Sequence, residues 1–202
     1  MFREHLAGLI GKAADLDVVG EADNIKEGFA LIKRIKPDVA IVDISLKGSN
    51  GLELLKDLRA HGIDVRVLVL SMHDESLYAE RALRAGARGY ITKHEASAKV
   101  MTAIRHVLAG EVFLNSRFMS LIMTKVMGGG NVSTDPIERL ADRELEVFEL
   151  IGRGLTTREI GEQLHLGTTT VDTYKARIKE KLQLGNIARL RSEASRWVQQ
   201  QE

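Results

Sequence analysis

Short, nearly continuous apolar runs alternate with helical patterns over the first part of the chain. The helical patterns repeat apolar residues every three or four positions, which places them on one face of a helix. The apolar runs are rich in β-branched residues and are typical of strands that are buried on both faces of a parallel sheet. The pattern predicts an α/β domain. Its expected strands are Asp17–Gly20, Val39–Val42, Val65–Leu70 and Gly89–Thr92.

From about Ile137 onward the pattern is helical throughout. Gly154 is placed to end a first helix, as a C-terminal glycine does. Thr156 and Glu159 have the spacing of a capping box, which opens a second helix. Gly167 interrupts that helix and a third one follows it. Two short helices that are joined by a tight turn predict a helix-turn-helix in an all-α domain.

A stretch of small, polar and turn-forming residues separates the two patterns at Gly128–Pro136. We therefore predict three parts. They are an α/β domain at residues 1–110, a linker with a helix and a glycine-rich hinge at 111–136, and a helical domain at 137–202.

Composition excludes several classes of protein. The 202 residues include no cysteine, which excludes a disulfide framework, a thiolate zinc site and a cysteine nucleophile. Aromatic residues make up 4%, too few for a platform on which nucleic-acid bases stack. The charged start is unlike a secretory signal, and no apolar run approaches the ~18 residues of a membrane span. We expect a cytoplasmic protein that does not contact a membrane.

Three polar residues directly follow apolar runs of the predicted sheet. They are Asp43, Ser71 and Lys93. In parallel sheets such positions share the edge where ligands bind. A carboxylate there could act as a nucleophile, with a hydroxyl and an ammonium group contacting a transferred phosphoryl group. The alternative is that each residue is merely a solvated strand end.

Charge is unevenly distributed in the helical domain. Residues 138–172 hold four basic and eight acidic side chains, whereas residues 173–196 hold seven basic and two acidic ones. The basic block begins inside the third helix, where contacts with DNA phosphates would need it. The alternative is a solvated helix face of mixed charge.

Helical geometry predicts which side chains of this third helix face outward. Val171, Ile178 and Leu182 share the inner face. A helix-turn-helix presents the opposite face, near the helix N-terminus, to base edges in the major groove. Thr173 could bond a base edge and Asp172 could accept from a cytosine amino group. The outward residues are Asp172, Thr173, Ala176 and Lys179.

These motifs resemble the response regulators of the NarL/FixJ family of two-component systems. The helical domain is similar to the LuxR-type DNA-binding domain at LADRELEVFELIGRG (140–154), TTREIGEQL (156–164) and TVDTYKARIKEKL (170–182). The α/β domain is similar to the receiver domain, which has a flavodoxin-like fold. That likeness rests on Val42-Asp43, Leu70-Ser71, the run AGARGY at 85–90, and Thr92-Lys93.

The resemblance implies roles for the receiver residues. Asp43 would accept phosphate from a sensor histidine kinase, Ser71 would bond the phosphoryl oxygen and Lys93 would pair with the phosphate. Tyr90 would be the switch aromatic. Asp43 and the backbone carbonyl of Ser45 would bind Mg²⁺. Phosphorylation would shift the receiver towards a conformation that frees the DNA-binding domain and promotes a homodimer.

The resemblance also implies binding to double-stranded DNA through the helix-turn-helix. A C-terminal helix carries Leu190, Ala194 and Trp197 on one face, which either forms a dimer contact or covers the domain's own core. The expected DNA-binding residues are Thr157, Thr169, Thr170, Asp172, Thr173, Lys175, Ala176 and Lys179.

The sequence departs from the family pattern at its beginning. Family receivers start with a strand that ends in two adjacent acids, and Phe2 already lies in what resembles the following helix. Without those acids, affinity for Mg²⁺ should fall, because this cation wants several oxygen ligands. The strand at Asp17–Gly20 would lose its neighbour, and the strand ending at Asp43 would expose an edge. The two strands would then pair directly, pair with a second protomer, or leave the region disordered. Alternatively, the sequence begins inside a longer receiver.

Three smaller departures concern single positions. Lys47 replaces the usual proline of the loop after Asp43, and Gly167 replaces the usual serine before the recognition helix. Ala141 replaces a Ser or Thr helix cap, which should cost about 1 kcal/mol unless Asp142 caps the helix instead.

Two other functions compete with a phosphorylation-controlled regulator. In the first, the incomplete receiver is a dimerisation or ligand module of a phosphorylation-independent LuxR-type transcription factor. In the second, Asp43 is the nucleophile of a phosphotransfer enzyme or phosphatase. Such enzymes need a metal site with two carboxylates, so we expect no enzymatic activity.

Overall fold

The computed structural model describes residues 2–46, 49–72, 76–116, 118–120, 123 and 136–201. The chain divides into two compact units, one of Met1–Leu46 with Gly51–Thr124 and one of Lys47–Asn50 with Lys125–Glu202. Lys47 and the glycine-rich stretch at 128–135 lie outside the described residues.

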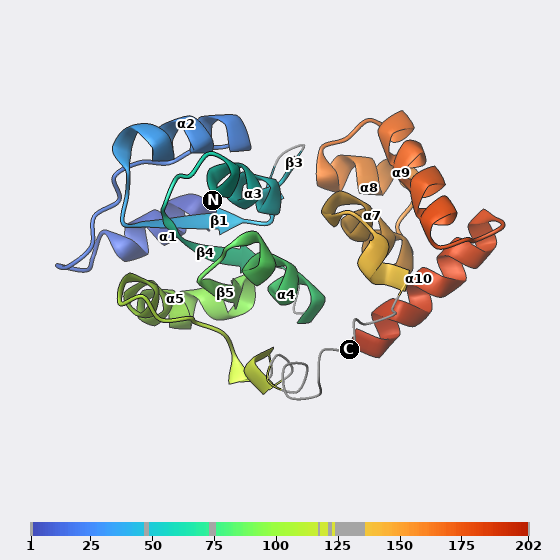
Figure 1. The fold of residues 1–202 in the computed structure, drawn as a ribbon. Coiled ribbons are helices and arrows are strands. Elements are labelled where there is room, and N and C mark those ends of the chain that lie inside the picture. The colour runs from blue at the N-terminus through green and yellow to red at the C-terminus, as the bar shows by residue number, and fades with distance from the viewer. Residues whose placement is uncertain are drawn as a thin grey trace. The chain divides into compact units, whose positions relative to one another are not determined.

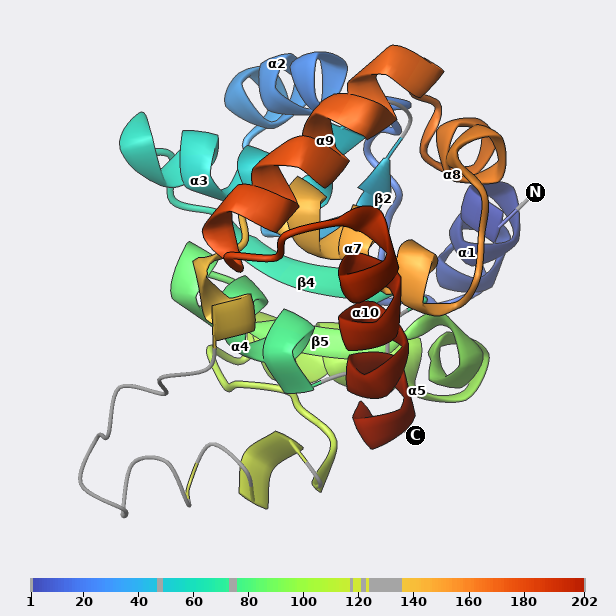
Figure 2. The same ribbon diagram turned by 90° about the vertical axis from the view of Figure 1, so that its right-hand side faces the viewer.

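The first unit is the predicted α/β domain (Figures 1 and 2). Its parallel sheet has the order β1-β4-β5. The strands are β1 (Val39–Asp43), β4 (Arg66–Ser71) and β5 (Gly89–Thr92), and a short strand, β2 (Ser45–Leu46), follows β1. The short strand β3 (Ser49–Asn50) is grouped with the second unit. The helices are α1 (Phe2–Ile10), α2 (Ile25–Ile35), α3 (Gly51–Ala60), α4 (Ser76–Ala85) and α5 (Lys93–Leu108).

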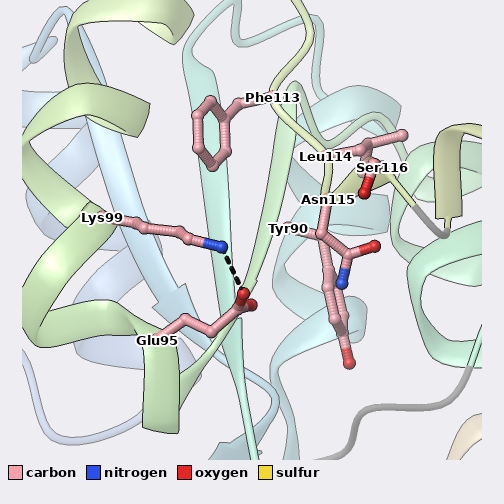
Figure 3. Close-up of a pocket in the computed structure, with 7 residues that line it drawn as sticks. All are labelled: Tyr90, Glu95, Lys99, Phe113, Leu114, Asn115 and Ser116. Carbon is pink, nitrogen blue, oxygen red and sulfur yellow. Dashed lines mark hydrogen bonds and ion pairs between the residues drawn. The ribbon is translucent and has the colours of Figure 1, made fainter.

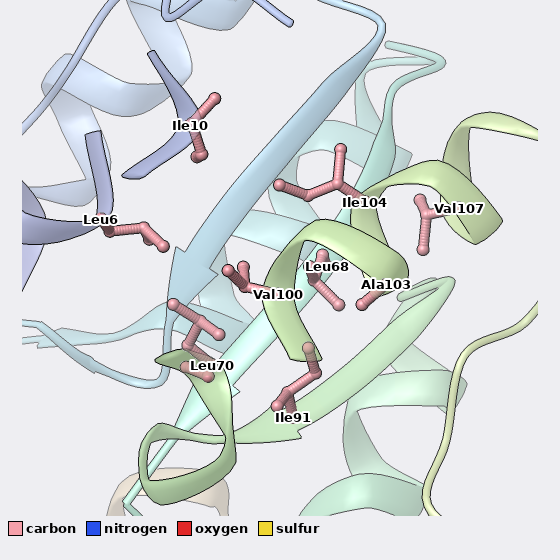
Figure 4. Close-up of a cluster of buried hydrophobic side chains, with 10 residues drawn as sticks. Leu6, Ile10, Leu68, Leu70, Ile91, Val100, Ala103, Ile104 and Val107 are labelled. Carbon is pink, nitrogen blue, oxygen red and sulfur yellow. The ribbon is translucent and has the colours of Figure 1, made fainter. Parts of the chain in front are cut away.

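Helices cover both faces of this sheet. α1 and α5 lie on one side, and α2, α3 and α4 lie on the other (Figures 1 and 2). Leu6 and Ile10 of α1 join Val100 and Ile104 of α5 in one apolar cluster over the strands (Figure 4). The sheet residues of this cluster are Leu68, Leu70 and Ile91. Because this core includes α1, the helix has a fixed place beside the sheet.

The strand predicted at Asp17–Gly20 is wrong. The structure gives these residues no strand, and Val18 and Val19 are 41% and 56% exposed. Strand geometry needs a hydrogen-bonding neighbour, and among the described residues β1 pairs with β4 on one side and with no strand on the other. As expected, this edge leaves the residues Val39–Ile41 half-buried, whereas Val67–Leu70 of β4 are buried.

The second unit is the predicted helical domain. A short 3₁₀ helix, η1 (Pro136–Arg139), precedes α7 (Asp142–Gly152), α8 (Thr157–Leu164), α9 (Thr168–Lys181) and α10 (Ile187–Gln201). α7 packs against the other three α-helices. Leu145 and Phe148 of α7 are fully buried, together with Ile160 of α8 and Val171 and Ile178 of α9.

Local signals in the sequence explain where these helices begin and end. The capping box of α8 is present, because Thr156 Oγ1 accepts from Glu159 N at 3.3 Å and Glu159 Oε2 accepts from Thr156 N at 2.7 Å. Gly154 has φ +87°, the left-handed conformation expected of a C-terminal glycine. Between α8 and α9, Leu166 N donates to Gly161 O at 2.8 Å, and a Cβ at Gly161 would lie 2.7 Å from Leu166 O. The tight turn therefore requires this glycine.

The C-terminal helix covers the core of its own domain. Leu190 and Ala194 are fully buried, and the Trp197 ring lies 5.8 Å from the Phe148 ring. The interpretation of these three residues as a dimer contact is therefore wrong, and the alternative is right. Leu182, predicted to face inward, is half-buried and ends α9.

Close approach of α7 and α10 predicts the effect of Gly152→Ala. A Cβ at Gly152 would lie 2.4 Å from Ala194 O, so the helices must separate. We expect the free energy of unfolding of this domain to fall by about 1–3 kcal/mol. Urea denaturation followed by fluorescence of Trp197, the single tryptophan, measures it. Gly185→Ala is the control, because its Cβ would meet no atom within 4 Å. Equal stability of both variants would contradict the packing.

The start of α7 predicts a stabilising substitution. Ala141 is the N-cap and forms no side-chain cap bond, while Glu144 Oε2 accepts from Ala141 N at 2.8 Å. Half of a capping box is thus in place. Ala141→Ser should supply the other half and raise the unfolding free energy by about 1 kcal/mol, measured by the same denaturation. Ala176→Ser, within α9, should not stabilise, and equal gains for both variants would refute capping as the cause.

Candidate functional site

Parallel pairing of the strands brings together the three polar residues predicted at one edge of the sheet. We call this edge, formed by Asp43, Ser71 and Lys93, the rim. Asp43 ends β1, Ser71 ends β4, and Lys93 follows β5 as the first residue of α5. Asp43 is in register with Leu70, and Ser71 is in register with Thr92. The Lys93 ammonium group forms an ion pair with the Asp43 carboxylate, and both side chains are partly exposed. The Asp43 carboxylate at the rim is therefore accessible, and the charge of Lys93 balances its own. The buried Ser71 hydroxyl lies on the adjacent strand.

The backbone around Asp43 is fixed by tight local contacts. Ser45 N donates to Asp43 Oδ1 at 3.0 Å. Gly51 N donates to Ile44 O at 2.7 Å, and a Cβ at Gly51 would lie 2.0 Å from Asp43 O. At the other side of the site, Thr92 caps α5 by accepting from Glu95 N at 3.3 Å. These bonds determine where the carboxylate and Lys93 stand.

The described residues fit an Mg²⁺ site poorly. Within the described ranges, no group of three His, Cys, Asp or Glu side chains could hold a metal ion. Asp43 and the Ser45 carbonyl are the expected ligands, and a hard divalent cation prefers about six oxygen ligands. Next to the rim, the Phe2 ring lies 5.4 Å from the Lys93 ammonium. Sequence reasoning missed this cation–π contact, since nothing local links the two positions.

Tyr90 is buried in the middle of β5 and does not belong to the rim itself. It is in register with Val69, two positions before the Thr92 that pairs with Ser71. Its ring meets the edge of the Phe118 ring at a centroid distance of 5.7 Å. Phe118 was not predicted, because it lies 28 positions away in the expected linker and has no motif around it.

Most of the predicted DNA-binding residues lie on the exposed side of α9. Thr169, Thr170, Asp172, Thr173 and Ala176 are exposed. The inner face is formed by Val171 and Ile178, as the spacing predicts. Thr173 Oγ1 donates to Thr169 O at 2.9 Å, which holds the hydroxyl close to its own helix.

Lys175 joins the two helices of the helix-turn-helix. Its ammonium group bonds Thr157 Oγ1 at the start of α8 and lies 3.7 Å from Asp172 Oδ1. Thr157 Oγ1 also lies 3.5 Å from Asp172 Oδ1. Three residues that were predicted as separate DNA contacts therefore form one polar cluster, which the sequence could not reveal because Thr157 lies 18 positions before Lys175.

The acidic residues of α7 have partners inside the domain. Glu144 is buried and accepts from Lys181 Nζ at 2.6 Å. Glu149 accepts from Arg153 at 2.5 Å. Part of the uneven charge along the sequence is therefore explained by an ion pair between α7 and the end of α9. Hydrogen bonds from the Thr156 backbone and hydroxyl hold the pKa of Glu159 below its usual value. The Glu159 carboxylate of the α8 capping box is thereby favoured in its ionised form.

None of the helices in the described part of the chain is long and apolar enough to cross a membrane.

Comparison with known families divides the chain in the same way. Residues 1–105 match the model of the response regulator receiver domain, and residues 138–194 match the model of bacterial regulatory proteins of the luxR family.

Similar proteins are found over nearly the whole chain. The DNA-binding transcriptional activator DevR/DosR of Mycobacterium tuberculosis is 34% identical over 180 residues, which are 89% of this chain and 82% of that protein. The nitrate/nitrite response regulator protein NarL of Escherichia coli is 29% identical over 201 residues, covering 100% of this chain and 91% of NarL.

Solved structures show the same fold. A LuxR-family response regulator from Aurantimonas is 31% identical, with a TM-score of 0.57, and covers 62% of this chain and 89% of that one. Promoter-bound RcsB of Salmonella enterica is 22% identical, with a TM-score of 0.58 and coverage of 95% and 92%. Together with the two domain matches, these relatives show that the chain belongs to the NarL/FixJ family of DNA-binding, two-component response regulators.

Proposed function

We propose that phosphorylation of Asp43 controls DNA binding by this response regulator. The observation that carries the proposal is the Asp43–Lys93 ion pair at the sheet rim, with Ser71 on the strand between their strands. An Asp43 carboxylate oxygen would attack the phosphorus of a phosphohistidine in a sensor kinase. The bond to the imidazole nitrogen would break, and the imidazole would take up a proton.

The rim residues would have distinct roles in the phosphorylated state. Lys93 would move from the carboxylate to the phosphoryl oxygens, where its charge offsets the new negative charge. The Ser71 hydroxyl would donate to a phosphoryl oxygen. Tyr90 would change position together with the end of β5. Asp43 and the Ser45 carbonyl are the groups that would hold Mg²⁺, which would supply charge neutralisation, and the described residues add no group of metal-ligating side chains to them.

A second function has an observation in its favour. The described residues offer no group of metal-ligating side chains at the rim, and efficient phosphoryl transfer depends on metal charge. In this alternative, the receiver is a phosphate-independent dimerisation or ligand module of a LuxR-type transcription factor. In either case, we propose a cytoplasmic homodimeric regulator without enzymatic turnover, with domain limits at 1–110, 111–136 and 137–202.

Intact-mass spectrometry after incubation with acetyl phosphate, with and without Mg²⁺, tests the site. We expect one phosphoryl group on the wild type and none on Asp43→Asn, because Asp43 carries the accessible rim carboxylate. Asp38→Asn is the matched control, since this exposed acid precedes the same strand at its opposite end. A wild-type chain that stays unmodified in both conditions would refute the proposal and favour the phosphate-independent function.

For DNA recognition, we propose that α9 lies in the major groove. Its exposed side would then meet base edges, with Asp172 accepting from a cytosine amino group and Thr173 contacting a neighbouring base. Lys175 and Thr157 would contact phosphates, and two subunits would bind half-sites about one helical turn apart. The full set of proposed contacts is Thr157, Thr169, Thr170, Asp172, Thr173, Lys175, Ala176 and Lys179.

The salt dependence of DNA binding tests the role of Lys175. If Lys175 contacts a phosphate, Lys175→Ala should lower the slope of log affinity against log salt by about 1, because one counterion fewer is released. Fluorescence anisotropy with a random-sequence duplex measures the slope. Arg196→Ala, which removes an exposed charge of α10 paired with Glu193, serves as the control. An unchanged slope for Lys175→Ala would show that its charge stays within the protein.

A further inference from the structure

We propose that the segment after α5 is a docked linker that reads the state of the phosphorylation rim through contact between Phe118 and Tyr90. The docked linker is defined as residues 112–116 and 118–120. The inference rests on the proposed role of Asp43 for its meaning in signalling, and it names how a change at the rim reaches the linker to the DNA-binding domain.

The docked linker extends the receiver sheet. Phe113 N donates to Arg88 O at 2.9 Å, and Tyr90 N donates to Phe113 O at 3.0 Å. These two bonds form a parallel bridge between Phe113 and Gly89. A Cβ at Gly89 would lie 2.7 Å from the Leu68 side chain and 3.3 Å from Phe113 O, so a larger residue there would crowd both Leu68 and the linker. The linker is therefore bound to β5, the strand that leads to Lys93.

Phe118 anchors the same segment by burying its ring. The side chain is 1% exposed, although it lies outside the predicted receiver domain. Its ring contacts the Tyr90 ring edge-on, at 5.7 Å and an interplanar angle of 79°. Asn115 Oδ1 accepts from Phe118 N at 2.9 Å, and Asn115 O accepts from Met119 N at 3.0 Å. The turn that starts at Asn115 thus aims Phe118 at the sheet.

A surface pocket adjoins Tyr90 on another side. A cavity of about 370 Å³ separates α5 from the docked linker, and the Glu95–Lys99 ion pair lies across it from Tyr90 and Asn115 (Figure 3). A shift of Tyr90 towards this pocket would remove the support of the Phe118 ring. The lining residues are Tyr90, Glu95, Lys99, Phe113, Leu114, Asn115 and Ser116.

The path from the rim to Phe118 is short and continuous. Lys93, the partner of Asp43, begins α5 directly after β5. Tyr90 lies in β5, and its backbone N–H donates to the carbonyl oxygen of Phe113 in the docked linker. When Lys93 moves from the Asp43 carboxylate to the phosphoryl oxygens, the ion pair that positions the end of β5 is rearranged. The linker bonded to this strand should then dock less firmly.

Hydrogen exchange of the full chain, followed by NMR without any phosphate donor, tests the contact. The probes are the backbone amides of Phe113, Phe118 and Met119. Phe118→Leu keeps an apolar side chain but loses the aromatic pair, so these amides should exchange about 2- to 10-fold faster. Tyr90→Leu should do the same, and the double variant should exchange no faster than either single one. Met119→Leu, at a partly exposed position of the same turn, should leave the amide of Phe113 unchanged.

Lys93→Met tests the link to the rim in the same experiment. Removing the ion pair should accelerate exchange of the three linker amides, while amides of the central strand β4 keep their protection and show that the variant is folded. Unprotected linker amides in the wild type, multiplicative effects of Tyr90→Leu and Phe118→Leu, or no response to Lys93→Met would each overturn the inference. Failure of Asp43 to accept phosphate would not change these exchange rates, so it would overturn the proposed function alone.

Discussion

The parallel hydrogen bonding of β1, β4 and β5 is the constraint on which the candidate site depends. These three strands are far apart in the sequence, and their pairing places the ends of all three at one edge of the sheet. Asp43, Ser71 and Lys93 have no local reason to meet. Their proximity follows from the register of the strands, and apolar packing from α5 and α1 holds that register. The site is therefore a product of the sheet, and any change that shifts the register would disperse it.

Close backbone approaches have a similar role elsewhere in the molecule. Gly51 allows the loop after β1 to return to the rim. In the DNA-binding domain, Gly152 allows α7 to approach α10, and Gly161 forms the turn before the recognition helix. At each of these positions a Cβ would meet another atom at 2.7 Å or less. Glycine at these positions thus allows neighbouring backbone segments to approach closely.

Local patterns in the sequence predicted the parts of the fold that local physics controls. The capping box at Thr156, the helix end at Gly154 and the inward side chains of Val171 and Ile178 in α9 are confirmed. The rim residues were also predicted, because the end of a parallel strand has a known edge. The strand at Asp17–Gly20 was wrong, since a strand needs a partner that its own sequence does not specify.

Contacts between distant positions were beyond sequence reasoning. The side chains of Leu190, Ala194 and Trp197 fit either a core or a dimer contact by spacing alone, and their packing against α7 decides for the core. Phe118 and Phe2 carry no motif, yet their rings lie beside Tyr90 and Lys93 respectively. Thr157 and Lys175 belong to one polar cluster although they lie in different helices. Tertiary packing created each of these relations.

The most direct test of the central claim compares DNA binding and mass in solution with and without beryllium fluoride plus Mg²⁺, which together mimic an aspartyl phosphate. The measurement uses the full chain, a random-sequence duplex and light scattering. The account predicts tighter DNA binding and a dimer in the presence of the mimic, and neither change in Asp43→Asn. Unchanged affinity and mass, in a chain that still binds DNA, would contradict control of the DNA-binding domain by the Asp43 rim.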